Sequence, residues 1–494
     1  MLCCLLAPLL WAQDVNFDQF FTGKTLRIDF YISGHAKTQT VVFDRLLAEG
    51  PWPGSPLRLI DTAHRGAFRT EIIDPASGRL IFASEMVSVF SEYAITPPAL
   101  AGEVRALHHS VRLPMPRNRV RWILKCRTPE NLWTVCHAQI LDPASPDLHR
   151  DPLPADVRIV EQQITGAPSE KVDLVFLGEG YTAEESNKFD GDLQRFTEVL
   201  FSVEPFQSHR DCFNIRGVFK ASEESGIDDP ARGRFVRTAL NATYRTLGMD
   251  HYLGTEANRA VRNLAAAAPY DVVLIMVNDP GFGGNGIYNW FTMFTTGSRA
   301  ADVVFLHELG HGFGGLADEY YGDVSSALTA SEIYRPGVEP YEPNITRLLD
   351  PEVVKWQWAV TPGIAIPTPW GQKRLDSLDA VLYATGRVAR AVLDSLRQGG
   401  ASTEVIELAR QRWTARRRDA FRLAQVERKM WMQRLQGEVG GFEGAAHMPK
   451  GVYRPAMECL MNHMIERSFC PVCRQAFLDR ILFYAPAARG AENQ

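Results

Sequence analysis

The chain has 494 residues, with 53 Lys and Arg against 58 Asp and Glu, which gives a formal net charge of −5. Hydrophobic residues make up 45% and charged residues 22%, an ordinary globular composition that excludes a mainly disordered or fibrous protein. A mildly acidic chain has no global electrostatic reason to bind nucleic acid or an anionic membrane surface. Eight cysteines are too few for a disulfide scaffold.

The first 13 residues are apolar almost throughout and give way abruptly to Asp14. They resemble the hydrophobic core and cleavage region of a secretory signal, with Ala12 as a candidate last residue, although the usual basic stretch before that core is missing. The alternative is a frayed apolar N-terminus that packs on the body. Further along the chain, no apolar stretch approaches the roughly 20 residues of a membrane-spanning helix, so we expect no integral membrane segment.

Residues 14–155 are predicted to form an antiparallel β-sandwich domain. Segments with alternating apolar residues are separated by turn clusters rich in Gly and Pro, and they show no strong helical period. These segments are residues 25–34, 38–47, 78–90 and 118–126. Cys126 and Cys136 flank an expected hairpin, where a disulfide and two buried free thiols would look the same in sequence. The Pro- and Asp-rich residues 142–156 are the predicted linker.

The pattern changes after the linker, and residues 156–494 are predicted to form an α/β catalytic domain. Apolar strands are expected at 171–178 and 271–277, with helices between them. Thr182 is the expected N-cap of the first helix, with Glu185 completing a capping box. Residues 301–316 are predicted to be mainly helical.

Residues 372–437 differ from the rest of this domain. They carry helical apolar spacing and many Arg, with a break at residues 398–401 that suits a turn. We interpret them as a helical-hairpin insertion, whose Arg-rich stretch is a solvated helix face.

The residues that carry chemistry are His307, Glu308 and His311, which form the motif H-E-x-x-H. Histidines four residues apart share one face of a helix, so both imidazoles can bind one ion. Glu308 lies at the edge of that face, where it can take a proton from a metal-bound water. Zinc lowers the pKa of such a water toward ~7 and polarises a carbonyl, so the motif predicts hydrolysis of peptide bonds at neutral pH. Because the histidines must be neutral to bind, activity should fall in acid.

The third metal ligand has two candidates, Asp318 and Glu319. Gly314 lies where metzincins place the glycine that ends the zinc helix, and a glycine can adopt the left-handed conformation that turns the chain back to the metal. The metzincin pattern would then put the third ligand at Ala317, which cannot bind zinc. Asp318 and Glu319 follow directly, and we favour Asp318 over Glu319. The other acid would support the metal ligands or bind a structural Ca²⁺.

Several sequence blocks occur in order across about residues 171–480, and together they resemble the IgA-peptidase-type family of secreted bacterial zinc metallopeptidases. The blocks are LVFLGEGYT (174–182), ESGIDDP (224–230), TALNATY (238–244), GGNGIYN (283–289), HELGHGFGGLADEYY (307–321), GGFEGAAHMPKGVYRP (440–455), CLMN (459–462) and FCPVC (469–473). The N-terminal β region resembles that family more loosely, and residues 372–437 look like a departure from its pattern.

The resemblance implies a metzincin-like α/β (α+β) fold, with substrate running along an active-site cleft. It matches His307 and His311 to the zinc ligands and Glu308 to the general base, and it leaves the choice between Asp318 and Glu319 open. It also favours a secreted or periplasmic location in a bacterium.

Three further roles are implied by the same resemblance. Met461 would be the methionine of the Met-turn, an apolar platform beneath the ligands. Tyr453 could stabilise the oxyanion, although a buried structural tyrosine fits equally well. Residues 283–288 could form a rim strand that pairs with extended substrate; the alternative is a flexible surface loop.

Cys459, Cys470 and Cys473 have the spacing C-x10-C-x2-C. A structural zinc site would need a fourth ligand, for which His463 is available. In a secreted protein we favour a disulfide from Cys459 to Cys470 or Cys473, which would fix the Met-turn.

The sequence therefore predicts a secreted zinc metalloendopeptidase with one catalytic zinc ion and a protein or peptide substrate. A hypothesis from another class is a catalytically silent binding or adhesion protein on a peptidase fold. The intact motif argues against it, because a silent scaffold has no chemical need for Glu308. A zinc hydrolase of non-peptide amides is a third alternative.

Overall fold

The computed structural model of the chain describes residues 15–151, 154, 156–248, 252–322, 330–331, 333–350, 352–462 and 468–486. The predicted secretory signal, residues 1–13, and His463 lie outside these ranges. Within them, no helix is both long and apolar enough to cross a membrane. We use "N-terminal region" for residues 14–155 and "C-terminal region" for residues 156–494.

The described part of the N-terminal region contains two four-stranded sheets, with strand orders β5-β1-β2-β8 and β4-β3-β6-β7. Neighbouring strands are antiparallel, except for the short parallel pair β2–β8. The strands are β1 (Phe21–His35), β2 (Thr38–Pro51), β3 (Phe68–Ile73), β4 (Leu80–Met86), β5 (Arg105–Pro116), β6 (Val120–Arg127), β7 (Trp133–Leu141) and β8 (Leu148–His149). Phe30 of β1 and Trp122 of β6 are fully buried, with their ring centroids 5.4 Å apart, so the two sheets share one core. This is the β-sandwich that the alternating pattern predicted.

The sandwich departs from the prediction after β4. The expected strand at 78–90 ends at Met86, because the Ser88 hydroxyl accepts a hydrogen bond from the Ser91 backbone N–H and caps a short helix. That helix is α2 (Val89–Ala94), and α3 (Pro97–Leu100) follows it; α1 (Phe17–Phe20) precedes the first strand. The prediction missed α2 because serine is also common in strands and loops.

The C-terminal region contains a six-stranded sheet in its described part, with the order β13-β14-β12-β10-β11-β9. The four inner strands are parallel, and β9 and β13 run antiparallel at the two edges. The strands are β9 (Arg158–Gln163), β10 (Val172–Glu179), β11 (Phe213–Phe219), β12 (Val272–Val277), β13 (Gly284–Ile287) and β14 (Phe291–Thr295). This region also contains the helices α4 (Ser186–Leu200), α5 (Asn258–Ala265), α6 (Ala301–Gly312) and α10 (Pro471–Tyr484). The predicted capping box precedes α4: Glu185 accepts a 3.0 Å hydrogen bond from the Thr182 N–H.

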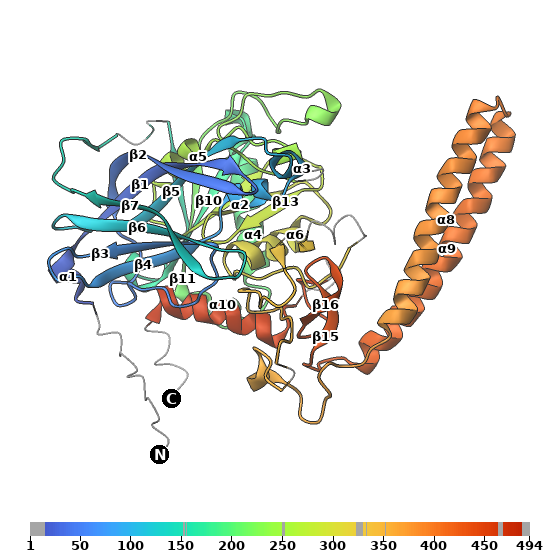
Figure 1. Cartoon of the computed structure of the whole chain (residues 1–494). Helices are drawn as coiled ribbons and strands as arrows, with labels where there is room; N and C mark the ends of the chain where they lie inside the picture. The colour runs from blue at the N-terminus through green and yellow to red at the C-terminus, as the bar shows by residue number, and fades with distance from the viewer. Residues whose placement is uncertain are drawn as a thin grey trace, which may run out of the picture.

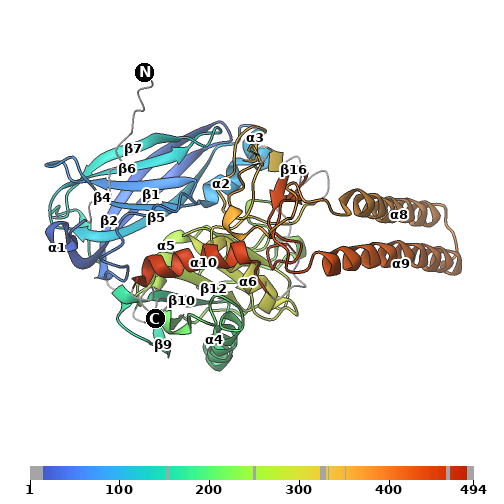
Figure 2. The same ribbon diagram turned by 90° about the horizontal axis from the view of Figure 1, so that it is seen from below.

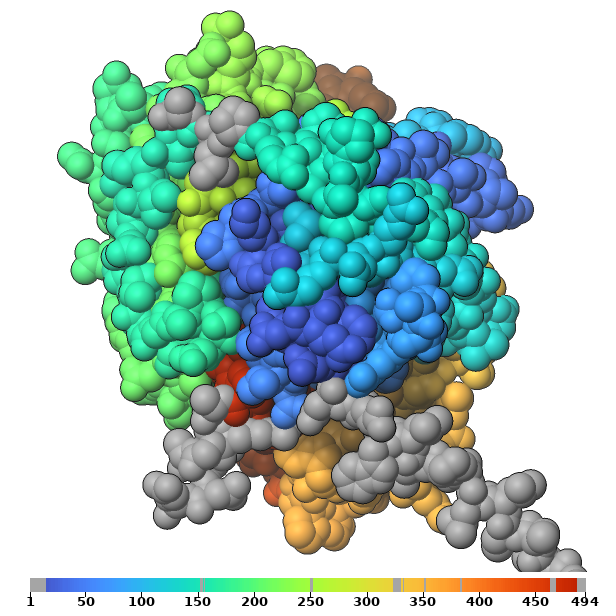
Figure 3. Space-filling model, turned by 90° about the vertical axis from the view of Figure 1, so that its left-hand side faces the viewer, coloured from blue at the N-terminus to red at the C-terminus, as the bar shows by residue number. Residues whose placement is uncertain are grey.

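Both faces of this sheet are buried, as parallel strands require. On β12, Ile275 and Val277 face a core that is continuous with the sandwich and α5, whereas Leu274 and Met276 face a second core with α4, α6 and α10. Figures 1 and 2 show the sandwich on one side of the C-terminal region, and in Figure 3 its blue and cyan atoms lie directly against the green atoms of that region.

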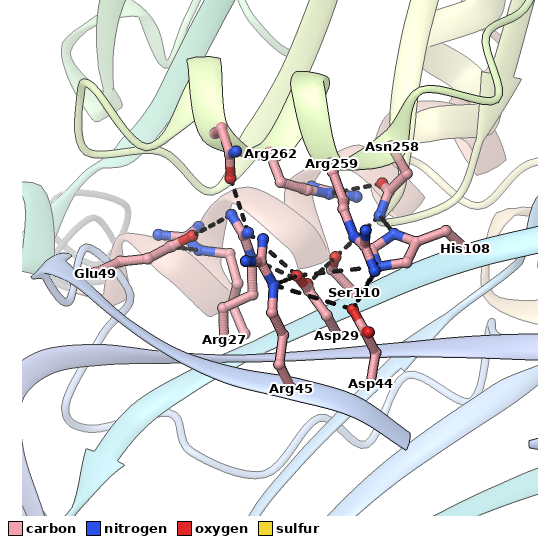
Figure 4. Close-up of polar contacts among 12 residues, drawn as sticks. Arg27, Asp29, Asp44, Arg45, Glu49, His108, Ser110, Asn258, Arg259 and Arg262 are labelled. Atoms are coloured by element: carbon pink, nitrogen blue, oxygen red, sulfur yellow. Dashed lines mark hydrogen bonds and ion pairs between the residues drawn. The ribbon is translucent and has the colours of Figure 1, made fainter. Parts of the chain in front are cut away.

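A polar network joins β1, β2 and β5 to α5 (Figure 4). Arg259 donates to Asp44 at 2.5 Å, and Asn258 donates to Ser110 at 2.9 Å. Arg27 crosses the same interface to Asn263 at 2.8 Å. These contacts fix how α5 lies against the sandwich.

The hairpin expected at 372–437 is formed by α8 (Gln372–Gln398) and α9 (Thr403–Arg434), which project away from the body in Figure 1. Its base lies against the two-stranded sheet of β15 (Phe442–Ala445) and β16 (Met448–Arg454). There the Trp370 indole donates to the Glu443 carbonyl at 3.1 Å.

Candidate metal centre and active site

Helix α6 carries the H-E-x-x-H motif and is anchored by its apolar face. Val304 and Phe305 are buried in the core beneath the sheet, so the helix cannot rotate away from it. The helix ends at Gly312, four residues earlier than predicted. The left-handed residue is Gly315, with φ of +63°, and not Gly314 as the motif suggested. Gly314 has a different constraint: a Cβ there would lie 2.7 Å from the Gly310 carbonyl oxygen.

Three ligand atoms converge at the end of α6. The Nε2 atoms of His307 and His311 lie 3.3 Å apart, and Asp318 Oδ1 lies 3.1 Å and 3.3 Å from them. Ligands placed about 2.0–2.1 Å from a tetrahedral ion are separated by about 3.3 Å. The spacing of the three atoms is therefore that of a metal site.

The orientation of the two imidazoles supports the same interpretation. His307 Nδ1 lies 3.1 Å from the Leu460 carbonyl, and His311 Nδ1 lies 2.7 Å from the Leu316 carbonyl. Because a carbonyl can only accept, each Nδ1 carries the proton and donates it, and in the neutral ring Nε2 presents a lone pair. Three lone pairs thus face one point, where a divalent cation would bind them.

Asp318 is held from its other side. Its Oδ2 lies 3.0 Å from His447 Nε2, while its buried Oδ1 has no hydrogen-bond donor among the described residues when the two motif Nε2 atoms that face it carry lone pairs. Burial raises the pKa of Asp318, but His311 and then His307 outweigh that effect and keep it well below its usual range. For His311 the opposite holds: burial lowers its pKa, but the negative charge of Asp318 outweighs burial and raises the pKa to about 9. Protons and a metal ion would therefore compete for the same atoms.

Glu308 points toward the edge strand β13. A Cβ on Gly284 would lie 2.7 Å from Glu308 Oε1, so only a glycine leaves room for the carboxylate there. The Gly286 backbone N–H donates a hydrogen bond to Glu308. Burial raises the pKa of Glu308, and the two motif histidines partly offset the rise. A carboxylate with a raised pKa next to a metal site is suited to accepting and returning a proton.

Glu319 lies in a different cluster. It is fully buried, and its Oε1 lies 3.0 Å from Cys473 Sγ and accepts a 3.0 Å hydrogen bond from the Asn344 amide. The proposed calcium role of the second acid finds no support, since Ca²⁺ takes six to eight oxygen ligands and this cluster offers thiols. The described cysteines, including Cys126 and Cys136, are free thiols.

Met461 and Tyr453 lie in different surroundings. Met461 is fully buried beneath α6, where a Cβ on Gly310 would lie 2.3 Å from its Sδ, and its carbonyl accepts a 2.8 Å hydrogen bond from the Glu319 N–H. Tyr453 lies on β16, where its backbone pairs with Thr346. Among the described interactions, none joins the Tyr453 hydroxyl to the His307 cluster.

Sequence reasoning missed several polar residues near this cluster. The Tyr252 hydroxyl lies near the side chains of Glu92 and Asn285, and it is within electrostatic range of Glu308. Glu92 comes from α2 of the N-terminal region and interacts electrostatically with His311. Tyr320 is hydrogen-bonded to Asp318. His447 stands in the block GGFEGAAHMPKGVYRP, Tyr320 in HELGHGFGGLADEYY and Asn285 in GGNGIYN, and these blocks were the available signals for them. Tyr252 and Glu92 lie outside the recognised blocks.

A third acidic cluster does not resemble a metal site. Asp29, Asp44 and His108 lie close together at the interface of Figure 4. The two carboxylates already have cationic partners, because Arg45 Nε lies 3.3 Å from Asp29 and Arg259 lies 2.5 Å from Asp44. Their charge is balanced without an ion.

Comparison with known families agrees with this geometry. A model of the IgA peptidase M64 family matches residues 160–481, and a model of the Peptidase M64 N-terminus matches residues 16–136. The chain belongs to the IgA peptidase M64 family. This confirms the resemblance drawn from the sequence blocks. A comparison with curated proteins found no match. Membership of the M64 family indicates a metallopeptidase, and hence a protein or peptide substrate.

Buried polar side chains outside the metal centre hold the segments around it in place by hydrogen bonds to their backbones. Glu179, from the block LVFLGEGYT, is buried and accepts hydrogen bonds from the backbone N–H groups of Leu240 and Ala242 at 2.8 Å and 2.7 Å. It thereby fixes the block TALNATY across the end of β10. Asn344 similarly binds both backbone polar groups of Ala317, which precedes Asp318.

Proposed function

We propose that this protein is a zinc-dependent endopeptidase whose metal is held by His307, His311 and Asp318. The observation that carries the proposal is that the Nε2 atoms of His307 and His311 and the Oδ1 atom of Asp318 all lie within 3.3 Å of one another. The Nδ1 proton of each histidine is donated to a backbone carbonyl, which leaves the Nε2 lone pair for a metal. Two imidazoles and a carboxylate are a donor set that zinc accepts in catalytic sites, where a fourth position stays open. When bound, zinc supplies Lewis acidity toward a peptide carbonyl and toward water.

Glu308 is the proposed general base. Its carboxylate would accept a proton from the attacking water and then return it to the amine that leaves, as its raised pKa and its place beside His307 allow. Asp318 and His447 would keep the ligand geometry fixed, because the second carboxylate oxygen is hydrogen-bonded to a ring that packs on Tyr320.

Substrate would bind along β13. This strand lies at the edge of the sheet, and its glycines pack against Glu308. An extended peptide could pair with the backbone groups at this edge that are not already engaged by the Tyr252–Gly284 bridge or by the contact of the Gly286 N–H with Glu308, which would bring a carbonyl to the metal. Pairing through the main chain is suited to peptides and gives little support to a non-peptide amide substrate.

The C-terminal region is proposed to follow the metzincin plan, with Asp318 in place of the usual third histidine. Support comes from Met461, which packs beneath Gly310 of α6, and from Leu460, whose carbonyl orients His307. The chain turns sharply at Gly315 to bring Asp318 back to the histidines.

The oxyanion would be stabilised by a tyrosine hydroxyl. The family resemblance suggested Tyr453, but the contacts of Tyr252 give this role more support, because its hydroxyl lies among Glu92, Asn285 and Glu308.

We also propose a secreted or periplasmic location in a bacterium, which rests on the apolar residues 1–13 and on the family.

The test is cleavage of an unstructured protein such as casein, with and without a chelator, alongside metal analysis. The Glu308→Gln variant is expected to keep its zinc and lose turnover by about 10²–10⁴-fold, because only the proton acceptor is removed. Full activity in this variant would contradict the role of Glu308. Zinc-bound wild-type protein without any peptidase activity on a broad peptide library would instead favour the silent binding protein.

A further inference from the structure

A second cluster of potential metal ligands lies directly behind the first. Its members are the side chains of Glu319, Cys459, Cys470 and Cys473, whose ligand atoms all lie within 4.8 Å of one another. All four residues are buried, and none is more than 3% exposed. Three thiols and a carboxylate are a donor set that the proposed catalytic reaction does not use.

The distances within the cluster are those of a tetrahedral zinc site. Sulfur ligands about 2.3 Å from zinc are separated by about 3.8 Å, and a sulfur and an oxygen ligand by about 3.6 Å. Cys459 Sγ lies 3.7 Å from Cys473 Sγ. Glu319 Oε1 lies 3.0 Å from Cys473 Sγ and 3.9 Å from Cys470 Sγ, values on either side of the ideal separation. The four side chains need only small shifts to surround an ion.

An unsatisfied atom points to the same conclusion independently. Glu319 is 0% exposed, and its Oε2 is buried without a hydrogen-bond partner among the described residues. An uncompensated buried carboxylate oxygen is costly, and a metal ion would remove that cost. Arg454, also buried and within electrostatic range of Glu319 and Cys459, would balance part of the excess negative charge of such a site.

We propose that Glu319, Cys459, Cys470 and Cys473 bind a structural zinc ion, separate from the catalytic one. Tetrahedral sites rich in sulfur select zinc over magnesium and calcium, which prefer oxygen ligands. The fourth ligand is Glu319, in place of the His463 that sequence spacing suggested. The site replaces the disulfide that we favoured from the sequence, because a bond between two of the sulfurs would leave the third thiol and the carboxylate without a partner.

The ion would join three segments that build the catalytic centre. Cys470 is the N-cap of α10 and Cys473 lies in its first turn. Cys459 directly precedes Leu460, whose carbonyl orients His307, and Glu319 directly follows Asp318. A structural zinc would therefore fix the position of two catalytic ligands without touching substrate.

The test separates the two sites by removing the first. A His307→Ala/His311→Ala variant has no catalytic site but retains all four ligands of the second, so its metal content does not depend on the proposed function. We expect about two zinc ions per chain in the wild type and one in this variant. Loaded with Co²⁺, the variant should show a thiolate-to-cobalt charge-transfer absorption, which nitrogen and oxygen ligands do not produce.

Two further variants identify the ligands. Adding Cys473→Ser to the double-histidine variant should abolish the remaining zinc and the charge-transfer band. Adding Cys212→Ser, a cysteine outside the cluster, should leave both unchanged. The proposal is overturned if the double-histidine variant binds no metal, or if mass spectrometry finds a disulfide among Cys459, Cys470 and Cys473 in the purified protein.

Discussion

Asp318 and Glu319 are adjacent in the sequence, yet their carboxylates lie in different clusters. Asp318 Oδ1 is 3.1 Å from His307 Nε2, whereas Glu319 Oε1 is 3.0 Å from Cys473 Sγ. The two consecutive side chains thus point to different clusters, so one short segment can supply a ligand to each site. The segment is fixed between them by the hydrogen bond from the Glu319 N–H to the Met461 carbonyl.

Because the two carboxylates lie in different clusters, isosteric substitutions of Asp318 and Glu319 should affect different metal sites. Asp318→Asn removes the charged ligand of the catalytic site, and we expect loss of the catalytic zinc and of activity, while the second site keeps its zinc. Glu319→Gln should weaken metal binding at the second site and lower the melting temperature. Zinc analysis and thermal melts of both variants would check this, and loss of activity without loss of metal in Asp318→Asn would contradict Asp318 as a ligand.

A second prediction separates two candidate tyrosines. Tyr252→Phe should lower kcat by about 10-fold or more with a smaller effect on KM, because a transition-state hydrogen bond is removed. Tyr453→Phe should leave kcat nearly unchanged, since its described interactions involve Glu443 and the backbone of Thr346. Steady-state kinetics on one peptide would decide, and the reverse pattern would restore Tyr453 as the oxyanion residue.

A third prediction concerns His447, which orients Asp318 from behind. His447→Gln keeps a donor but shortens its reach, whereas His447→Ala removes the 3.0 Å contact altogether. Loss of such supporting contacts typically costs 10–100-fold in metal affinity. Competition with a zinc chelator should therefore rank the wild type above Gln and Gln above Ala. If all three bound zinc equally, His447 would have no role in orienting Asp318.

Site residues could be predicted from the sequence where their contacts join residues close together in the chain, and were missed where the contacts join distant residues. His307, Glu308 and His311 were identified because a helix brings residues four apart onto one face. The hairpin and the sandwich followed from periodicity in the same way. By contrast, His447 reaches Asp318 across 129 residues, and Glu92 comes from the other region of the chain. Such contacts depend on how whole elements pack, and no local pattern encodes that.

A similar limit applies to residues whose role depends on their neighbours. Cys459, Cys470 and Cys473 were recognised by spacing, but the spacing could not distinguish a disulfide from a metal site. The fourth ligand was sought nearby at His463, while the fold supplies Glu319 from 140 residues earlier. The left-handed glycine was likewise misplaced by one residue, because H-E-x-x-H fixes the helix but not the path of the chain after it.

A fourth prediction concerns two ion pairs that join α10 to the N-terminal region. Arg480 and Asp61 are 2.8 Å apart and each only 2% exposed, whereas Arg65 pairs with Asp479, which is 49% exposed. Asp61→Asn leaves a buried guanidinium unpaired and should lower the free energy of unfolding by about 3–5 kcal/mol. Asp479→Asn should cost less, about 1 kcal/mol, because Asp479 is exposed to water and the buried Arg65 guanidinium keeps its hydrogen bonds to the Gly314 and Ala476 carbonyls. Denaturant unfolding would compare them, and equal losses would contradict the argument from burial.

The last prediction concerns stability in acid and rests on His109, which is fully buried between the two regions. Its ring lies 4.9 Å from that of Trp290, its Nδ1 lies 2.8 Å from the Leu107 carbonyl, and its Nε2 has no described partner. Burial lowers the pKa of His109 from 6.5 to about 3. Below pH 6.5 the unfolded chain therefore binds a proton at His109, whereas the folded protein does not bind it until about pH 3. The contribution of neutral His109 to the free energy of unfolding is thus fully present above pH 6.5 and is lost as the pH falls toward 3.

Between pH 7 and pH 4.5 this single group should cost the wild type on the order of 2–3 kcal/mol, at about 1.4 kcal/mol per unit of pH below 6.5. His109→Phe keeps an aromatic ring against Trp290 but cannot bind a proton, so its free energy of unfolding should fall less steeply over the same range. His149→Phe, at an exposed position, is the matched control and should follow the wild type. Urea unfolding of the three proteins at several pH values gives the slopes, and parallel slopes for wild type and His109→Phe would show that His109 is not the group that limits stability in acid.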